Sequence, residues 1–164
     1  MSQQQQSVLA HLDAKGIPYR VIYHDPVYTI EEMEQLELNQ YGEIAKNLFL
    51  RNSNGKTHFL VVLCHDKTVN LKELRRKLES SALSFASEER LQKYLGLTRG
   101  AVSPLGILNN HEKNVIAVFD NDLKKYEQIG VHPNDNTATL WLTLDDILRI
   151  VTENGNEIRF LDFD

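Results

Sequence analysis

A lysine interrupts a strand pattern that is otherwise apolar. Residues 44–50 read IAKNLFL, and two-residue alternation places Lys46 on the same face as three apolar side chains. An ammonium group without a partner is costly to bury. The side chain is therefore expected to reach solvent at the rim of the sheet, to pair with a carboxylate, or to line a pocket that binds an anionic or carbonyl group. The residues alone leave these alternatives open.

A short segment rich in glycine and proline follows a helical pattern and precedes a strand pattern. Residues 100–106 read GAVSPLG, so Gly100 and Pro104 have the spacing G-x-x-x-P. A rigid loop of this composition can direct backbone N–H groups at a ligand oxygen. An ordinary connection between two elements has the same composition, so both interpretations of this loop stand.

A third candidate is His132, in the polar stretch 131–137 (VHPNDNT) that precedes a strand pattern. Because Pro133 follows it, the backbone of His132 is biased towards an extended conformation, and this bias can fix the direction of the imidazole. A plain surface turn is the competing interpretation.

A basic helix face is the fourth candidate. Lys72, Arg75 and Arg76 have helical spacing and lie opposite the leucines at positions 71, 74 and 78. Such a pattern usually marks a solvent-exposed helix face. The more specific alternative is a face that binds phosphate groups.

Several kinds of chemistry lack the residues that they need. The segment Gly55-Lys56-Thr57 resembles the end of a phosphate-binding loop, but that motif needs a glycine where Leu50 stands and a helix after it. None of the six histidines forms an HExxH pair or lies in a CxxC context, so we predict no metal and no cofactor. Cys64 closes an apolar strand pattern and no GxSxG elbow is present, so covalent catalysis is not expected.

The elements that must hold these residues alternate between strand and helix patterns. Apolar runs bounded by polar turns predict strands near residues 19–23, 45–51, 58–64, 82–86, 115–120, 138–142 and 157–163. Helix start signals occur at Thr29, Asn70, Ser87 and Thr143, each followed within three residues by an acidic side chain. The runs 45–51 and 58–64 are joined by a polar turn and predict an antiparallel hairpin. The predicted fold class is α+β, a mixed α/β arrangement.

Length and composition predict one domain over residues 1–164. The chain has 41% hydrophobic and 25% charged residues, close to the average of globular proteins, and no internal repeat or linker divides it. Because the formal net charge is -5, any contact with nucleic acid needs a local basic patch, and DNA binding is not expected.

The sequence also predicts a compartment. One cysteine cannot form an internal disulfide, and the longest wholly apolar stretch, residues 59–64, is far shorter than the roughly 20 residues of a membrane span. The start carries no basic and then apolar signal region. We therefore expect a cytoplasmic protein without a membrane partner.

The candidate residues occur in a familiar order. The Lys46-Asn47 strand, the loop from Gly100 to Pro104 and the segment 132–134 follow one another as in the YbaK/ProX family of aminoacyl-tRNA editing domains, which this chain resembles. The resemblance extends over most of the chain, from the strand near Tyr19 through residues 83–95 to the final strand. Within the family, the chain is most similar to the free-standing ProX (PrdX-type) proteins, which hydrolyse alanine mischarged on tRNA(Pro).

The resemblance implies a fold, a reaction and a site. The fold is a curved mixed sheet flanked by helices, without metal, and the reaction is deacylation of Ala-tRNA(Pro). The implied catalytic positions are Lys46 and Gly100, and the implied substrate-binding positions are Asn47, Ser103, Pro104 and His132. With such a substrate, Lys72, Arg75 and Arg76 become candidates for contacting the acceptor end of tRNA(Pro), and prolyl-tRNA synthetase becomes a candidate partner.

The implied reaction has a physical rationale. A synthetase pocket shaped for proline cannot strongly reject the smaller alanine, because missing methylenes are worth only about 1–3 kcal/mol. A second pocket that admits alanine and collides with proline must do the rejecting. We assign this selection to His132 and the loop near Gly100 as a hypothesis.

Other functions remain open at this stage. A related deacylase could clear serine, cysteine or a nonprotein amino acid, since the volume of the pocket decides the substrate. A non-catalytic module could bind tRNA or a synthetase with the same fold. A regulatory nucleic-acid-binding protein is disfavoured by the charge of -5 and by the lack of a basic recognition helix.

Overall fold

The computed structural model describes residues 2–27 and 29–163. Its α-helices are α1 (Gln3–Ala14), α2 (Ile30–Gln35), α3 (Leu71–Lys77), α4 (Glu88–Leu95) and α5 (Leu144–Asn154). Its strands are β1 (Arg20–Tyr23), β2 (Glu43–Arg51), β3 (His58–Cys64), β4 (Ser84–Phe85), β5 (Val115–Asp120), β6 (Ile129–Val131), β7 (Ala138–Leu142) and β8 (Ile158–Leu161). Short 3-10 helices are η1 (Leu38–Tyr41), η2 (Pro104–Asn109) and η3 (Asn121–Lys125).

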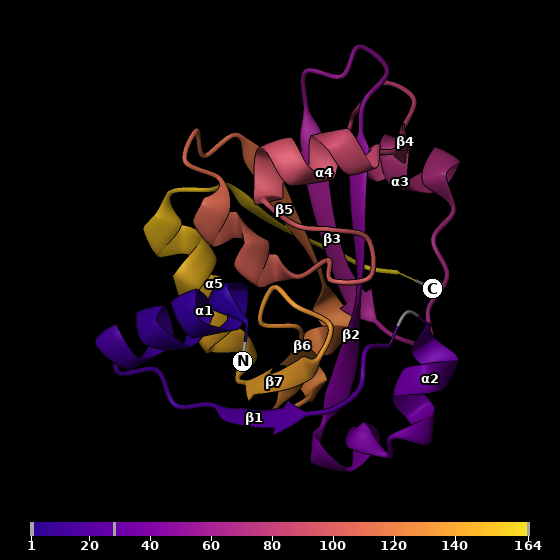
Figure 1. Ribbon diagram of the computed structural model, residues 1–164. Helices are drawn as coiled ribbons and strands as arrows, with labels where there is room; N and C mark the ends of the chain where they lie inside the picture. The colour runs from indigo at the N-terminus through magenta and orange to yellow at the C-terminus, as the bar shows by residue number, and fades with distance from the viewer. Residues whose placement is uncertain (1, 28, 164) are drawn as a thin grey trace.

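The strands form one mixed sheet in the order β1-β7-β6-β2-β3-β5-β8, and β4 pairs with β2 beside this path. β2 and β3 make the predicted antiparallel hairpin, whereas the pairs β2–β6, β3–β5 and β5–β8 are parallel. In Figure 1 the long β2–β3 hairpin runs up the molecule while β1 and β7 cross below it. The predicted α+β class and the curved mixed sheet flanked by helices are confirmed.

Two strand predictions differ from the structure. The predicted strand 82–86 is reduced to the two residues of β4, because Ser87 already caps the next helix. β6 is a strand that the sequence pattern does not indicate, since a periodicity cannot be read from three residues, one of them glycine. The segment after Ser103, predicted as a rigid loop, turns into η2.

Side-chain caps begin the helices at the predicted positions. Asn70, Ser87 and Thr143 each accept hydrogen bonds from backbone N–H groups in the first turn of α3, α4 and α5. Thr29 accepts one from the N–H of Glu32 ahead of α2. Each such cap stabilises its helix by about 1 kcal/mol, so the sequence fixes where these helices begin.

Helices cover both faces of the sheet. One face is buried against α1, α4, α5 and η2 and forms the main apolar core, in which Leu12, Leu95 and Ile147 are fully buried. On the other face, β2, β3 and β5 pack against Leu74 and Leu78 of α3. A small third cluster around Trp141 includes Leu38 of η1 and Ile44 of β2.

The edge of β2 away from β3 is only partly paired. β6 pairs with one end of β2 and β4 with the other, and in the part of the chain that the structure describes no strand pairs with residues 45–49 between them. The N–H of Ala86 donates to the carbonyl of Phe49 on this side. Because backbone groups alternate along a strand, the N–H and carbonyl of Asn47 face the same gap.

His58, the first residue of β3, is a buried polar group in the apolar core. Its ring lies between Phe49 and Tyr94, with ring centroids 5.4 and 3.9 Å away. Nη1 of Arg90 lies 3.1 Å from Nε2 of His58. Because the guanidinium can only donate, Nε2 of His58 is the acceptor and carries no proton. Burial, together with the charges of Arg90 and Arg51, lowers the pKa of His58 from 6.5 to about 4.

This depressed pKa predicts a loss of stability in mild acid. Above about pH 6.5 the imidazole is neutral in both the folded and unfolded states, whereas between about 6.5 and 4 only the unfolded chain binds the proton. The free energy of unfolding should therefore fall by about 1–2 kcal/mol between pH 7 and pH 5 in the wild type and by less in His58→Gln. Urea unfolding at the two pH values measures this difference. An equal pH dependence in His58→Gln and in the exposed control His111→Gln would contradict it.

Candidate active site

A cavity of about 290 Å³ lies at the gap in the β2 edge. Its walls come from residues 44–47 of β2, from Arg99, Gly100 and Val102, from residues 130–132 with Thr139, and from Val27 and Thr29 before α2. The volume lies just below the range of about 300–1,000 Å³ that is typical of ligand pockets. The cavity therefore suits a small chemical group at the end of a larger ligand.

Lys46 lines this cavity, and its ammonium group is held in place by a backbone carbonyl. Nζ of Lys46 donates to the carbonyl oxygen of Lys67, 2.9 Å away, in the loop that follows β3. An ammonium group has three N–H donors, and among the described residues one of the three has a partner. Of the alternatives that the sequence leaves open, a carboxylate partner is not seen among the described residues, and Lys46 lines a cavity; that this cavity binds an anionic or carbonyl group stays a prediction.

A buried carboxylate fixes the loop that carries this carbonyl. Asp120 is fully buried and accepts hydrogen bonds from the backbone N–H of Cys64 and from Nζ of Lys67, at 3.1 and 2.9 Å. Nζ of Lys67 also lies 2.6 Å from Asp122. Burial opposes the charge on Lys67, but its hydrogen bonds with Asp122 and Asp120 outweigh burial and raise the pKa of its ammonium group. The charged pair therefore positions the partner of Lys46.

Asn47 presents polar atoms to the same cavity. Its Nδ2 donates to the carbonyl of Ala45 at 3.4 Å, whereas its Oδ1 is buried and has no hydrogen-bond partner among the described residues. An unpaired buried acceptor is uncommon in a folded protein. Oδ1 of Asn47 is thus a buried acceptor that no donor among the described residues satisfies.

The loop that carries Gly100 is tied to the segment that carries His132. Gly100 has a φ of 88°, a left-handed conformation that favours glycine. The hydroxyl of Ser103, which is fully buried, donates to the carbonyl of His132 at 2.6 Å and accepts from the N–H of Leu105. Ser103 and the buried Pro104 start η2 and do not line the cavity, so their place in the structure is to connect two of its walls.

His132 forms a neutral wall of the cavity. Its Nδ1 lies 3.1 Å from the carbonyl of Ala138, which can only accept, so Nδ1 carries the proton. Burial lowers the pKa of His132, and the nearby His24 adds to this effect. The imidazole is therefore uncharged near neutral pH and limits the space available without attracting an anion.

The basic residues of α3 lie outside the cavity. Lys72, Arg75 and Arg76 are exposed, and none of them contributes to the cavity wall. Arg99 does line it, and this exposed residue, paired with Glu88 at 3.4 Å, is one that the sequence analysis misses. Thr139 is missed as well, although a polar residue inside the apolar run 138–142 is the same kind of signal that singles out Lys46.

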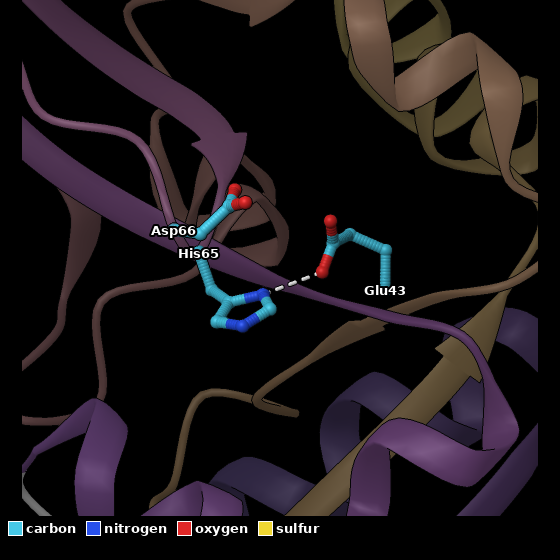
Figure 2. Close-up of side chains that lie close together, drawn as sticks. All are labelled: Glu43, His65 and Asp66. Carbon is cyan, nitrogen blue, oxygen red and sulfur yellow. Dashed lines mark hydrogen bonds and ion pairs between the residues drawn. The ribbon is translucent and has the colours of Figure 1, made fainter.

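A cluster that could hold a metal ion lies beside the site. Glu43, His65 and Asp66 each place a ligand atom within 4.8 Å of the others. Figure 2 shows the imidazole of His65 turned towards Glu43, with Nδ1 2.5 Å from Oε1. Two ligands of one tetrahedral zinc ion lie about 3.4 Å apart, so this pair would have to separate before both could bind it. As arranged, the cluster is a hydrogen-bonded pair beside an exposed carboxylate.

Comparison with known proteins gives the class of this protein. The profile described as the aminoacyl-tRNA editing domain matches residues 24–150. Over 157 residues the chain is 50% identical to the prolyl-tRNA editing protein ProX of Acetoanaerobium sticklandii, a match that covers 96% of each chain. The chain belongs to the aminoacyl-tRNA editing domain family.

Further relatives agree with this assignment. The chain is 36% identical over 145 residues to the prolyl-tRNA synthetase associated domain-containing protein 1 of Danio rerio, covering 87% of this chain and 78% of the relative. A crystal structure of a candidate trans-editing enzyme for prolyl tRNA synthetase superposes with a TM-score of 0.77 over 100% of this chain and 98% of the other, at 20% identity. That likeness supports the fold. Among the helices described, none could cross a lipid bilayer.

The buried pair behind Lys46 generates a stability prediction. Lys67→Met leaves the carboxylate of Asp120 buried without its cation, so the free energy of unfolding should fall by about 3–5 kcal/mol. Adding Asp120→Asn should recover part of the loss. Lys125→Met, which removes an exposed ion pair with Asp122, should change the free energy by less than about 1 kcal/mol. Urea unfolding measures all three, and a loss below about 1 kcal/mol in Lys67→Met would contradict the role given to the pair.

Proposed function

We propose that this protein is a trans-editing hydrolase that removes alanine from mischarged tRNA(Pro). The observation that carries the proposal is that Lys46, Gly100 and His132, which are far apart in the sequence, line one small cavity in a member of the editing family. The 50% identity with a prolyl-tRNA editing protein supports tRNA(Pro) as the RNA.

Selection against proline is proposed to come from the fixed position of two cavity walls, because the volume of about 290 Å³ is not by itself too small for a pyrrolidine ring. The hydroxyl of Ser103 fixes the Gly100 loop against the backbone of His132, so these two walls cannot separate easily. A pyrrolidine ring needs more room than a methyl group, and overpacking a rigid site costs about 1–3 kcal/mol or more. Under this proposal, correctly charged Pro-tRNA(Pro) is spared because its ring collides with these walls when the ester is held at Lys46.

The proposed reaction is hydrolysis of the ester between alanine and the terminal ribose. Water attacks the carbonyl carbon, the bond to the ribose oxygen breaks, the ribose oxygen takes a proton, and free alanine and tRNA leave. Negative charge builds on the carbonyl oxygen, and the backbone N–H groups of Asn47 and Gly100 are the candidate donors for it. Lys46 supplies a fixed cation for the carbonyl or for the terminal phosphate. A hydroxyl of the terminal ribose positions the water.

The tRNA contact is proposed to be small and local. A chain with a net charge of -5 binds RNA only through a basic patch, and the exposed face of α3 with Lys72, Arg75 and Arg76 is the proposed contact for the acceptor end. Prolyl-tRNA synthetase is the proposed source of the mischarged substrate and a candidate partner. We also propose a cytoplasmic location, where a tRNA substrate is available.

Serine is the second candidate amino acid. Thr29, Asn47 and Thr139 all contribute polar side chains to the cavity, and a seryl hydroxyl is only slightly larger than the methyl group of alanine. A deacylase for another small amino acid uses the same site and the same chemistry.

The first test is direct deacylation. Purified protein should release alanine from Ala-tRNA(Pro) at least about 100-fold faster than proline from Pro-tRNA(Pro), and Lys46→Ala should lower kcat/KM on Ala-tRNA(Pro) by about 100-fold because a fixed charge at the reacting group is lost. Lys56→Ala, in the exposed β2–β3 turn, is the matched control and should keep the wild-type rate.

Near-normal deacylation by Lys46→Ala would show that Lys46 is not part of the active site. Faster release of serine from Ser-tRNA(Pro) than of alanine from Ala-tRNA(Pro) would favour serine as the substrate. Binding of tRNA without release of any amino acid would identify a non-catalytic module.

A second test addresses the RNA contact. Arg75→Glu/Arg76→Glu should weaken binding of tRNA(Pro) by about 10-fold or more and reduce its salt dependence, because two phosphate contacts are lost. Hydrolysis of a minimal alanyl-adenosine ester should be unchanged. Arg149→Glu, on α5 at the opposite side of the molecule from α3, is the control (Figure 1). Equal loss on the tRNA and on the minimal ester would contradict a role confined to RNA binding.

A further inference from the structure

The turn that follows β3 carries the carbonyl group that holds Lys46. The antiparallel ladder between β2 and β3 ends at the pair of Ala45 and Cys64. The chain then turns through residues 64–67, and the N–H of Lys67 donates to the carbonyl of Cys64 at 3.2 Å. Because this turn lies beyond the last ladder pair, its position relative to β2 depends on side-chain contacts. The ammonium group of Lys46 in turn depends on where the turn places the carbonyl of Lys67.

Glu43 and His65 make a contact of this kind. Nδ1 of His65 lies 2.5 Å from Oε1 of Glu43, and Figure 2 shows the imidazole and the carboxylate facing each other. A carboxylate can only accept, so Nδ1 carries the proton. Glu43 is 5% exposed, and a hydrogen bond to a charged group is stronger where water is excluded. The pair therefore joins the first residue of β2 to the turn.

The turn is anchored on two sides. Lys67 binds the buried carboxylate of Asp120 on β5 at 2.9 Å, and this bond fixes the turn towards β5. His65 binds Glu43, and this bond fixes the turn towards β2. The carbonyl that accepts from Lys46 lies between these two anchors in space and two residues after His65 in the sequence.

We propose that His65 and Glu43 position Lys46 for the reaction by holding the turn that carries the carbonyl of Lys67. This inference rests on the proposed function, in which Lys46 supplies a fixed cation to the substrate. Neither His65 nor Glu43 lines the cavity, so both are positioning residues and not catalytic ones. Misplacing a reacting group by about 1 Å costs about 100-fold in rate, so an anchor of the turn affects the reaction without touching the substrate.

The two nitrogens of His65 have different surroundings, which gives a specific test. Nε2 lies 3.6 Å from the exposed carboxylate of Glu34 on α2, too far for a hydrogen bond. The anchor is therefore the bond at Nδ1. An asparagine amide nitrogen is bonded to Cγ, as Nδ1 of histidine is, whereas a glutamine amide nitrogen lies one atom further out, as Nε2 does. His65→Asn should keep the anchor and His65→Gln should lose it.

Deacylation of Ala-tRNA(Pro) measures the effect on the reaction. His65→Leu and His65→Gln should lower kcat/KM about 10-fold, and His65→Asn should stay within about 3-fold of the wild type. The matched control is His58→Leu, which removes the buried imidazole at the other end of β3 and should also stay within about 3-fold where all variants are folded. An equal loss in His65→Asn and His65→Leu, or in His58→Leu and His65→Leu, would overturn the inference.

Coupling to Lys46 distinguishes positioning from support of the fold. In a Lys46→Ala background, His65→Leu should lower kcat/KM by less than about 2-fold further, because the group that it positions is gone. A residue that only stabilises the fold would lower the rate equally with and without Lys46, and that result would contradict the proposal. If His65→Leu does not fold, because Glu43 is left buried without its donor, Glu43→Gln/His65→Leu takes its place in each comparison.

Chemical labelling of Lys46 separates this inference from the proposed function. The probe is limiting acetic anhydride, and mass spectrometry of peptides gives the rate at which Lys46 is acetylated. A hydrogen-bonded ammonium group reacts more slowly than a free one, so this rate should rise about 3-fold or more in His65→Leu and stay unchanged in His58→Leu. The exposed Lys56 reports the dose of reagent in each sample.

The labelling result decides the inference whatever the fate of the proposed function. A faster acetylation of Lys46 in His65→Leu, reversed in His65→Asn, supports the positioning of Lys46 even if the protein hydrolyses no ester. Release of alanine by the wild type, with the same acetylation rate of Lys46 in His65→Leu, would leave the function standing and overturn the inference.

Discussion

The unpaired stretch in the middle of β2 is the constraint on which the site depends. A parallel neighbour, β6, occupies one end of this edge and an antiparallel neighbour, β4, occupies the other, so the residues between them have no strand beside them in the region that the structure describes. Backbone groups that would otherwise hold a sheet together face a cavity. The fold thereby supplies fixed donors and acceptors without any rearrangement, which is what stabilisation of a developing charge requires.

The site is supported by polar groups that do not themselves line the cavity. Asp120 fixes Lys67, and the carbonyl of Lys67 fixes Lys46. The hydroxyl of Ser103 ties two walls together, and His24 orients Thr139. Each of these supports comes from a different part of the chain, so the geometry of the cavity depends on the completed fold and not on any one loop.

Much of the fold could be predicted because its signals are local. The hairpin, the four helices whose start signals were recognised and the mixed class follow from alternation and from cap residues within a few positions of one another. β6 could not be predicted, because three residues carry no periodicity. For the site, the sequence singles out Lys46 as an interruption of an apolar face but cannot choose between rim and pocket, since its partner is a backbone carbonyl 21 residues away. Arg99 was missed because its proximity to Lys46 exists only after folding, whereas Thr139 interrupts an apolar run and could have been singled out as Lys46 was. The roles of Ser103 and Pro104 in substrate binding remain predictions.

The hydrogen bond between Ser103 and His132 constrains how the amino-acid specificity of this family can evolve. Because one hydroxyl joins the two walls, lengthening either loop breaks a buried hydrogen bond before it enlarges the pocket. New amino-acid preferences are therefore more accessible through exchange of single side chains on the inner surface, such as those at positions 27, 102 and 131, than through insertions. Paralogues that prefer a different amino acid should keep the same backbone and differ at these apolar positions.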